Sequence, residues 1–318
     1  MNKIKFSATD LQMVPLIFGG NVFGWTLDEK QSFAILDEFV DKGFNAIDTA
    51  NNYSHWVLGN IGGESETIIG NWVQKKGNRH DVVLMTKVGG RFGYDSVFNT
   101  KGSYIKEQVE LSLKRLRTDY IDLYQTHYDQ EETAIEETLR AYEDLINEGK
   151  VRYIGASNIA PERFVESLDI AVEKQLPSYV SLQPEYNLFD RAKFEHLYQD
   201  LAKERNIAVI PYYALASGFL SGKYTSEASF EETVRGKGIK DKYWNERGRR
   251  IIKALHEVAS KHQVSSSAIA LAWLLLQDTI FGPIASATKS SHIDAFIDAL
   301  RVKLDNQDIT ILNESSIY

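Results

Sequence analysis

The chain has 318 residues, of which 43% are hydrophobic, and its 36 Lys and Arg against 44 Asp and Glu give a formal net charge of −8. This acidic balance disfavours nucleic acid as a partner, so an anionic ligand needs a local basic site. The absence of cysteine excludes disulfides, thiolate metal sites and cysteine nucleophiles. The longest apolar run, residues 268–276, is shorter than the roughly 20 residues that span a bilayer. Since the first twenty residues contain no apolar signal region, we expect a cytoplasmic protein without a membrane partner.

Short apolar or β-branched runs alternate with amphipathic stretches along the chain. The runs predict strands at residues 14–18, 45–49, 82–87, 120–127, 151–156, 179–184, 208–213 and 280–285. A capping box of Thr26 and Glu29 predicts the start of the first helix, and Gly43 predicts its end. The other start and stop signals predict helices at 64–77, 103–116, 133–148, 161–174, 192–205, 246–262 and 265–277.

Eight such strand–helix units without a break in composition predict an α/β fold, a (β/α)8 TIM barrel with an N-terminal strand or hairpin. We expect residues 1–318 to form one domain. No G-x-G-x-x-G follows the first strand, and Gly222 with Lys223 lacks the remainder of a P-loop, which disfavours a Rossmann or P-loop domain. The long loops 89–102 and 222–245 are expected at the C-terminal face of the barrel, over the site.

Polar residues end three successive predicted strands, where a barrel of this kind carries its active site. They are Asp48, Lys87 and His127, and Tyr53 follows Asp48 by five residues in a loop. A tyrosine with a pKa near 10 is a poor acid-base catalyst at neutral pH unless a nearby cation stabilises the phenolate. Lys87 can supply this charge, Asp48 can hold the ammonium, and His127 can donate to a substrate carbonyl while Tyr53 shuttles the proton. Each residue also has a structural explanation as a cap, an ion pair or a loop aromatic, but together they predict a catalytic site.

Several stretches resemble signatures of the aldo-keto reductase family, and the likeness covers essentially the whole chain. They are FNAIDTA at 44–50 with Tyr53, GESE at 63–66, MTK at 85–87 and DYIDLYQTH at 119–127. The resemblance implies that Tyr53 is the general acid-base. It also implies a nicotinamide cofactor that transfers hydride to or from the substrate carbon.

Other segments are similar to those that hold the cofactor in this family. Amide and hydroxyl groups end the fifth and sixth predicted strands, and an aromatic residue ends the seventh, as the nicotinamide half requires. The segment ALASGFLSGK at 214–223 resembles the pyrophosphate loop, whose small residues permit close backbone approach. The cofactor-binding residues implied are Gly20, Asn21, Asp48, Ser157, Asn158, Gln183, Tyr212, Leu215, Ser217, Gly218, Leu220, Lys223, Lys289 and His292.

The segment PIASATKSSH at 283–292 departs from the family pattern for the adenosine phosphate. His292 and Phe296 stand where many members have Arg and Asn. Lys289 can still bind a ribose 2′-phosphate, because phosphate needs cationic donors rather than one residue type. NADP(H) is therefore the favoured cofactor, and NAD(H) remains the alternative.

The substrate is less well defined than the reaction. Six aromatic residues near the rim are candidates for the substrate pocket, namely Phe23, Trp25, Trp56, Tyr94, Tyr128 and Trp244. The leading hypothesis is reduction of an aldehyde or ketone, or the reverse oxidation of a sugar or alcohol. The alternatives are an NAD-dependent sugar dehydrogenase on the same scaffold and a cofactor-sensing protein with little turnover. No H-E-x-x-H or similar spacing is present, so we expect no metal, and we expect a monomer or weak homo-oligomer.

Overall fold

A parallel sheet of eight strands forms the centre of the protein in this computed structural model, which describes residues 1–93, 96–231 and 236–318. The strand order is β10-β3-β4-β5-β6-β7-β8-β9. The strands are β3 (Ile17–Gly19), β4 (Ala46–Asp48), β5 (Val83–Val88), β6 (Ile121–Thr126), β7 (Val151–Ser157), β8 (Tyr179–Gln183), β9 (Ala208–Val209) and β10 (Ile284–Ala285).

The sheet closes on itself between β9 and the segment that leads into β10. The amide of Val209 donates to the carbonyl of Thr279 at 3.1 Å, and the amide of Phe281 donates to the carbonyl of Val209 at 2.8 Å. This pairing confirms the predicted (β/α)8 barrel. The last two strands are shorter than predicted, because Pro211 and Pro283 lack the amide hydrogen that a strand ladder requires.

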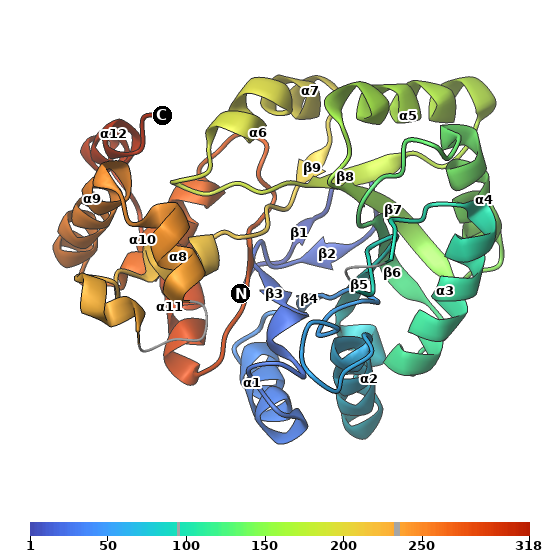
Figure 1. Cartoon of the computed structure of the whole chain (residues 1–318), viewed down its shortest axis with the longest axis horizontal. Coiled ribbons are helices and arrows are strands. Elements are labelled where there is room, and N and C mark those ends of the chain that lie inside the picture. The colour runs from blue at the N-terminus through green and yellow to red at the C-terminus, as the bar shows by residue number, and fades with distance from the viewer. Residues whose placement is uncertain (94–95, 232–235) are drawn as a thin grey trace.

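Helices follow the strands and form a ring around the sheet (Figure 1). The α-helices are α1 (Glu29–Asp41), α2 (Glu64–Lys76), α3 (Gly102–Leu116), α4 (Ile135–Asn147), α5 (Pro161–Lys174), α6 (Ala192–Leu197), α7 (Gln199–Glu204), α8 (Gly236–Tyr243), α9 (Glu246–His262), α10 (Ser266–Leu275), α11 (Ser290–Arg301) and α12 (Asn306–Ser315). Short 3₁₀ turns are η1 (Gly20–Val22), η2 (Arg79–Asp81), η3 (Ala216–Ser221) and η4 (Glu227–Phe230). Within the described residues, no helix combines the length and the apolar character needed to cross a bilayer.

Two predicted helices differ from the observed ones. The capping box of α1 is formed by Asp28 and Gln31 rather than by Thr26 and Glu29. The Asp28 side chain accepts from the amide of Gln31 at 2.8 Å, and the Gln31 side chain accepts from the amide of Asp28 at 3.1 Å. The single helix predicted at 192–205 is divided into α6 and α7 at Tyr198. The Tyr198 backbone leaves the helical region with φ −128°, and its buried hydroxyl donates to the carbonyl of Ile159 at 2.7 Å.

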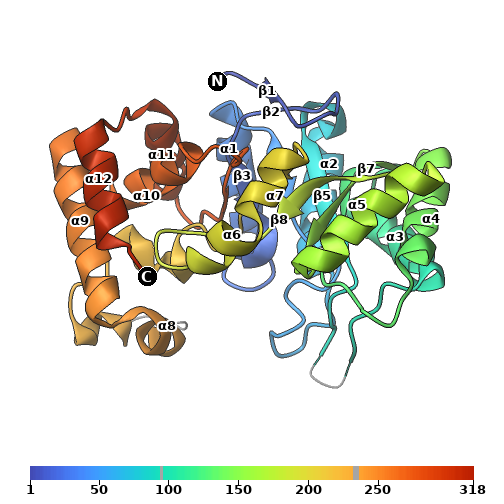
Figure 2. The ribbon, with the colours of Figure 1, turned by 90° about the horizontal axis from the view of Figure 1, so that it is seen from above.

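An N-terminal hairpin closes the end of the barrel at which the strands begin. It consists of β1 (Ile4–Lys5) and β2 (Gln12–Met13), and it lies over the middle of the ring of helices in Figure 1. Phe6, Leu11 and Met13 are buried in an apolar cluster with side chains from the first half of the strands. Figure 2 shows the hairpin on one side of the sheet and the long loops that follow β4 and β5 on the other.

The apolar cluster forms a floor below a polar layer. Its strand members include Ala46, Met85 and Leu123. Successive side chains of a strand alternate between the two faces of a sheet, so the residues two positions further along face the same interior. These residues are Asp48, Lys87 and Gln125.

Candidate active site

Lys87 is a buried cation at the carboxyl end of β5. Its Nζ donates to Asp48 Oδ2 at 2.5 Å, to the backbone carbonyl of Thr49 at 2.8 Å and to the hydroxyl of Tyr53 at 3.0 Å. The Lys87 and Asp48 side chains are 0% and 1% exposed. Because an unpaired buried charge is costly, Asp48 is the counter-ion that allows the ammonium to remain here. The structure thus brings together three of the four predicted catalytic residues.

Two glutamines hold the second oxygen of Asp48. Gln125 Nε2 donates to Asp48 Oδ1 at 2.9 Å, and Gln183 Nε2 donates to the same oxygen at 3.1 Å and to Gln125 Oε1 at 3.0 Å. Gln183 is a predicted site residue, but Gln125 was not predicted. The run that contains it, residues 119–127, also contains Asp122 and Thr126, so no pattern distinguishes Gln125 before its register with Asp48 is known.

The charges around Lys87 determine the protonation of Tyr53. Burial lowers the pKa of Lys87, but Asp48 and Tyr53 outweigh this effect and raise it above its ordinary value, so the ammonium is charged at neutral pH. Burial raises the pKa of Tyr53, and the charge of Asp48 raises it as well. The charge of Lys87 lowers the pKa, but the sum of these effects places it above its ordinary value. The expected stabilisation of the phenolate by Lys87 is therefore present but outweighed by burial. The phenol is protonated at neutral pH and is a potential proton donor.

His127 follows β6 and faces Tyr53, with 5.9 Å between the ring centroids. Burial holds the pKa of His127 well below its ordinary value, and the charges of Lys87 and His55 lower it further. The imidazole is therefore neutral at pH 7 and carries one N–H group. Its Nδ1 is buried and has no hydrogen-bond partner among the residues that the structure describes.

Further polar groups form a chain of hydrogen bonds along the ends of β7, β8 and β9. The hydroxyl of Ser157 donates to the carbonyl of Gln183 at 2.8 Å, and Asn158 Nδ2 donates to the carbonyl of His127 at 2.9 Å. The hydroxyl of Tyr212 donates to Asn158 Oδ1 at 2.9 Å. The structure therefore brings these predicted cofactor residues together next to the tetrad of Asp48, Tyr53, Lys87 and His127. Gly20 and Asn21 in η1 lie at the end of β3, where their oxygens accept from Ser65 at 2.7 Å and Ser286 at 2.6 Å.

The turn η3 has the open backbone that a phosphate group requires. Ser217 and Gly218 have φ angles of 57° and 97°, in the left-handed region. A Cβ added at Gly218 would meet only Lys223 Nζ, at 3.9 Å, so the space above this backbone is open. Leu215 is partly buried, and Leu220 is buried in the core below the turn. An open turn beside a lysine fits the pyrophosphate of a nicotinamide cofactor.

A basic cluster lies next to this turn at the start of α11. The exposed Lys223 and Lys289 both lower the pKa of the partly buried His292, after the larger effect of burial. The amide of Thr288 donates to His292 Nδ1 at 3.2 Å, so a neutral His292 carries its proton on Nε2. Lys289 at the N-terminus of α11, together with Lys223 after η3, fits a phosphate group.

Aromatic side chains flank the tetrad on two sides. Trp56 packs edge-on against Tyr53 at 6.1 Å and against Trp25 at 5.5 Å. On the other side Tyr128 follows His127 and stacks on Phe98, a residue that was not predicted, at 4.5 Å.

The other three predicted pocket residues are Phe23, Trp244 and Tyr94. The prediction for Phe23 is wrong, because η1 turns this side chain inwards, where it is 0% exposed and stacks on Phe18 at 5.3 Å. Trp244 packs against Phe230 within the 222–245 insertion, at 5.2 Å. Tyr94 lies outside the described residues.

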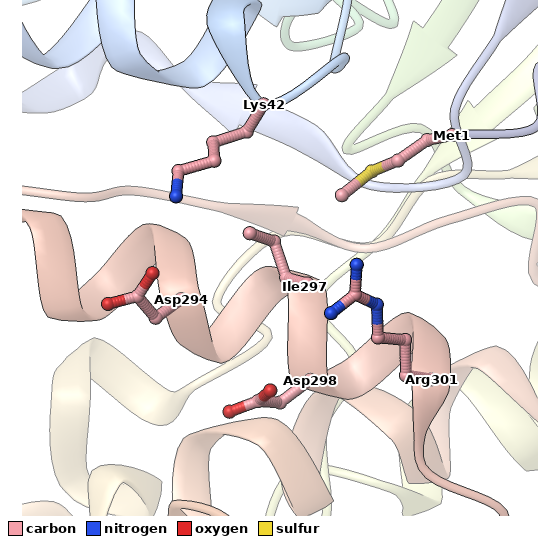
Figure 3. A pocket seen from close by; sticks show the side chains of 6 residues that line it. All are labelled: Met1, Lys42, Asp294, Ile297, Asp298 and Arg301. Atoms are coloured by element: carbon pink, nitrogen blue, oxygen red, sulfur yellow. The ribbon is translucent and has the colours of Figure 1, made fainter.

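A separate hollow of about 450 Å³ lies on the hairpin side of the barrel, between the end of α1 and the second half of α11 (Figure 3). It contains none of the predicted site residues, and its lining is Met1, Lys42, Asp294, Ile297, Asp298 and Arg301. It is therefore not the candidate active site. No group of three His, Asp or Glu residues in the described ranges is arranged to hold a metal ion.

A comparison with known families identifies the family of the chain. The profile of the Aldo/keto reductase family matches residues 15–317. The chain belongs to this family. This membership confirms the resemblance found in the sequence, and it makes the protein an NAD(P)-dependent oxidoreductase of the carbonyl-reducing kind.

Individual relatives align with this chain over nearly its whole length. The uncharacterized oxidoreductase YqkF of Bacillus subtilis (strain 168) is 34% identical over 316 residues, which cover 98% of this chain and 95% of the relative. The aldo-keto reductase YhdN of the same organism is 33% identical over 310 residues, with 94% and 88% covered. Versiconal hemiacetal acetate reductase of Aspergillus parasiticus is 31% identical over 314 residues, with 92% and 88% covered.

Proposed function

We propose that this aldo-keto reductase reduces an aldehyde or ketone, or oxidises the corresponding sugar or alcohol, with NADP(H) as the favoured cofactor and Tyr53 as the general acid-base. The observation that carries the proposal is the position of the Tyr53 hydroxyl, 3.0 Å from the buried ammonium of Lys87. We also propose that residues 1–318 act as one barrel domain, as a monomer or weak homo-oligomer.

Tyr53 is the proton donor of the proposed reduction. A bound nicotinamide supplies the hydride to the substrate carbon. The Tyr53 hydroxyl gives its proton to the carbonyl oxygen as negative charge develops there, and its raised pKa keeps the phenol protonated until then. Lys87 then stabilises the phenolate by its charge, and Asp48 keeps the ammonium in place. In the direction of oxidation, Tyr53 accepts the proton of the alcohol.

His127 is the second hydrogen-bond donor to the carbonyl oxygen in this proposal. A neutral imidazole donates from one nitrogen, and its low pKa prevents it from competing with Tyr53 as an acid at neutral pH. Two donors that converge on one oxygen polarise the carbonyl and make its carbon a better hydride acceptor.

The cofactor would be held by three groups of residues. The nicotinamide half would lie against Gly20, Asn21, Asp48, Ser157, Asn158, Gln183 and Tyr212, the pyrophosphate against Leu215, Ser217, Gly218, Leu220 and Lys223, and the adenosine phosphate against Lys289 and His292. The preference for NADP(H) rests on the two lysines beside His292, because a ribose 2′-phosphate adds negative charge at that place.

Fluorescence titration with NADPH and NADH, followed by turnover with aldehydes, ketones and sugars, tests the proposal. Tighter binding of NADPH together with carbonyl reduction is the expected result. Tighter binding of NADH with sugar oxidation would favour the NAD-dependent dehydrogenase. Binding without turnover would favour a cofactor-sensing protein, and binding of neither cofactor would contradict the proposed function.

A further inference from the structure

Arg91 is an exposed arginine in the loop that follows β5, next to the tetrad. Its backbone carbonyl accepts from Asn52 Nδ2 at 2.7 Å, and Asn52 directly precedes Tyr53 in the chain. The backbone of the preceding residue, Gly90, lies close to His127, since a Cβ added to Gly90 would be 2.8 Å from His127 Nδ1. The backbone of Arg91 is therefore anchored beside the two proposed donors to the carbonyl oxygen.

Two aromatic rings lead from His127 to the guanidinium group of Arg91. The ring centroids of His127 and Tyr128 are 4.9 Å apart, and Tyr128 stacks on Phe98 at 4.5 Å. Arg91 Cζ lies over the Phe98 ring, 4.3 Å from its centroid. Burial raises the pKa of Tyr128, and the charges of Lys87 and Arg91 both lower it. The buried ammonium and the exposed guanidinium are therefore both within electrostatic reach of the same ring.

The guanidinium group of Arg91 has no carboxylate within 4.0 Å among the residues that the structure describes. Two carboxylates act on the tetrad and on Tyr128, and each already has a cationic partner. Asp48 pairs with Lys87 at 2.5 Å, and Glu185 pairs with Lys242 at 2.7 Å. Arg91 is thus a cation beside the site that no described carboxylate pairs with, in a protein whose net charge is −8.

A guanidinium group held over an aromatic ring is suited to an anionic ligand. The cation–π contact restricts the side chain, and the N–H groups stay available for the two oxygens of a carboxylate or a phosphate. The rings of Phe98 and Tyr128 offer apolar faces to the part of a ligand that lies between its anionic group and its carbonyl. A carbonyl oxygen at Tyr53 and an anionic group at Arg91 can therefore belong to one molecule.

We propose that Arg91 binds an anionic oxygen group, a carboxylate or a phosphate, of the carbonyl substrate. The inference rests on the proposed function and narrows its substrate class to aldehydes and ketones that carry an acid group several bonds from the carbonyl. Tyr53 and His127 hold the carbonyl, the spacer lies along Tyr128 and Phe98, and the anion pairs with Arg91. A neutral aldehyde meets the same tetrad but lacks this last contact.

The compounds para-carboxybenzaldehyde and its methyl ester test the proposal as a charged and a neutral aldehyde of similar shape. The readout is the ratio of their kcat/KM values, acid over ester, in the wild type and in Arg91→Gln, because the intrinsic reactivity of the two aldehydes cancels between proteins. We expect the substitution to lower this ratio about fivefold, the upper range for an exposed ion pair, mainly through the KM of the acid. High salt is expected to lower the ratio in the wild type, because it screens an exposed pair.

Glyceraldehyde phosphate and glyceraldehyde give the corresponding ratio for a phosphate group. A fall of the carboxylate ratio alone would assign a carboxylate to Arg91, and a fall of the phosphate ratio alone would assign a phosphate. If Arg91→Gln changes neither ratio, the proposal is overturned.

Lys101→Gln is the matched control. Lys101 is also an exposed cation of the loop between β5 and α3, so its loss changes the net charge by the same amount. We expect this variant to keep the wild-type ratios. Equal falls in Arg91→Gln and Lys101→Gln would show that the general charge of the loop acts on the substrate, and would overturn the assignment to Arg91.

Calorimetric titration with para-toluate, which has the carboxylate but no aldehyde, tests Arg91 without turnover. We expect its Kd to be about fivefold higher in Arg91→Gln than in the wild type. Equal Kd values would contradict the inference even if neutral aldehydes are reduced. The expected difference in Kd, together with no reduction of any aldehyde, would contradict the proposed function instead, so the two failures are distinguishable.

Discussion

Gln125 on β6 donates its side-chain amide to Asp48 Oδ1 on β4, 2.9 Å away, across the inside of the barrel and past β5. Lys87 occupies the other carboxylate oxygen at 2.5 Å. Asp48 is therefore held from both sides, and the direction in which it holds Lys87 depends on Gln125. Tyr53, the proposed acid-base group, thus depends through Lys87 and Asp48 on a residue two strands away that it does not touch.

Gln125→Leu is expected to lower both stability and turnover. The substitution removes a donor to a buried carboxylate, which corresponds to about 1.5–3 kcal/mol of unfolding free energy. Urea unfolding and steady-state kinetics measure the two effects. Gln108→Leu is the control, because Gln108 is also buried but pairs with the neutral Asn51 at 3.0 Å. If both variants have the same kcat, Gln125 does not support the site.

Tyr53→Phe is expected to keep cofactor affinity and lose turnover. The ring keeps its packing against Trp56, whereas the hydroxyl that Lys87 contacts is removed. A positioned acid-base group contributes about 10²–10⁴-fold, so kcat is expected to fall by that factor. Fluorescence titration with NADPH and single-turnover kinetics separate binding from chemistry. Undiminished turnover would remove Tyr53 from the proposed mechanism.

Lys289→Ala is expected to weaken NADPH more than NADH. Removing one cationic donor from a phosphate site corresponds to about a tenfold rise in KM for NADPH. The KM for NADH is expected to change little, because NADH lacks the 2′-phosphate. Lys303→Ala, an exposed lysine beyond α11, is the charge-matched control. Equal effects of Lys289→Ala on the two cofactors would contradict a role in phosphate recognition.

Asp308→Asn is expected to make the protein less sensitive to acid. Burial raises the pKa of Asp308, but hydrogen bonds from Lys261 at 2.8 Å and His262 at 2.7 Å, with the backbone of Asp305, lower it from 3.8 to about 2. A lowered pKa stabilises the fold above pH 4, and this contribution is lost as the pH falls towards 2. Its size is about 2 kcal/mol.

Urea unfolding at pH 6 and at steps down to pH 2 measures this contribution. The wild type is expected to lose about 2 kcal/mol more than Asp308→Asn between these limits. Parallel stability curves for the two proteins would show that Asp308 is not held in its charged form by these partners.

The order of the strands could be predicted because each short apolar run is followed by an amphipathic stretch. The ends of elements were harder to predict, because they depend on contacts between distant residues. The helical pattern is interrupted at Tyr198, whose hydroxyl donates to the carbonyl of Ile159, 39 residues earlier in the chain. Phe23 was assigned to the pocket because it follows the first strand, but the turn η1 directs it into the core.

The proximity of Asp48, Lys87 and His127 could be predicted because each ends a predicted strand and strand ends meet at one rim, and that of Tyr53 because it follows Asp48 by five residues. Gln125 could not be separated from ordinary buried strand residues, because its function depends on register with Asp48 two strands away. The approach of Asn52 and His127 to the backbone of Gly90 depends on the path of two loops, which no periodicity in the sequence predicts.

The hairpin of β1 and β2 covers the end of the barrel at which the strands begin. Phe6, Leu11 and Met13 are buried there in an apolar cluster, which separates Lys87 and Asp48 from water on this side of the described residues. In the proposed reduction, the substrate and the cofactor would both enter at the opposite end, where the strands end. Whichever of the two lies deeper would arrive first and leave last. Changes in the loops at that end can then alter what the enzyme admits, and in what order, without changing the apolar end under the hairpin.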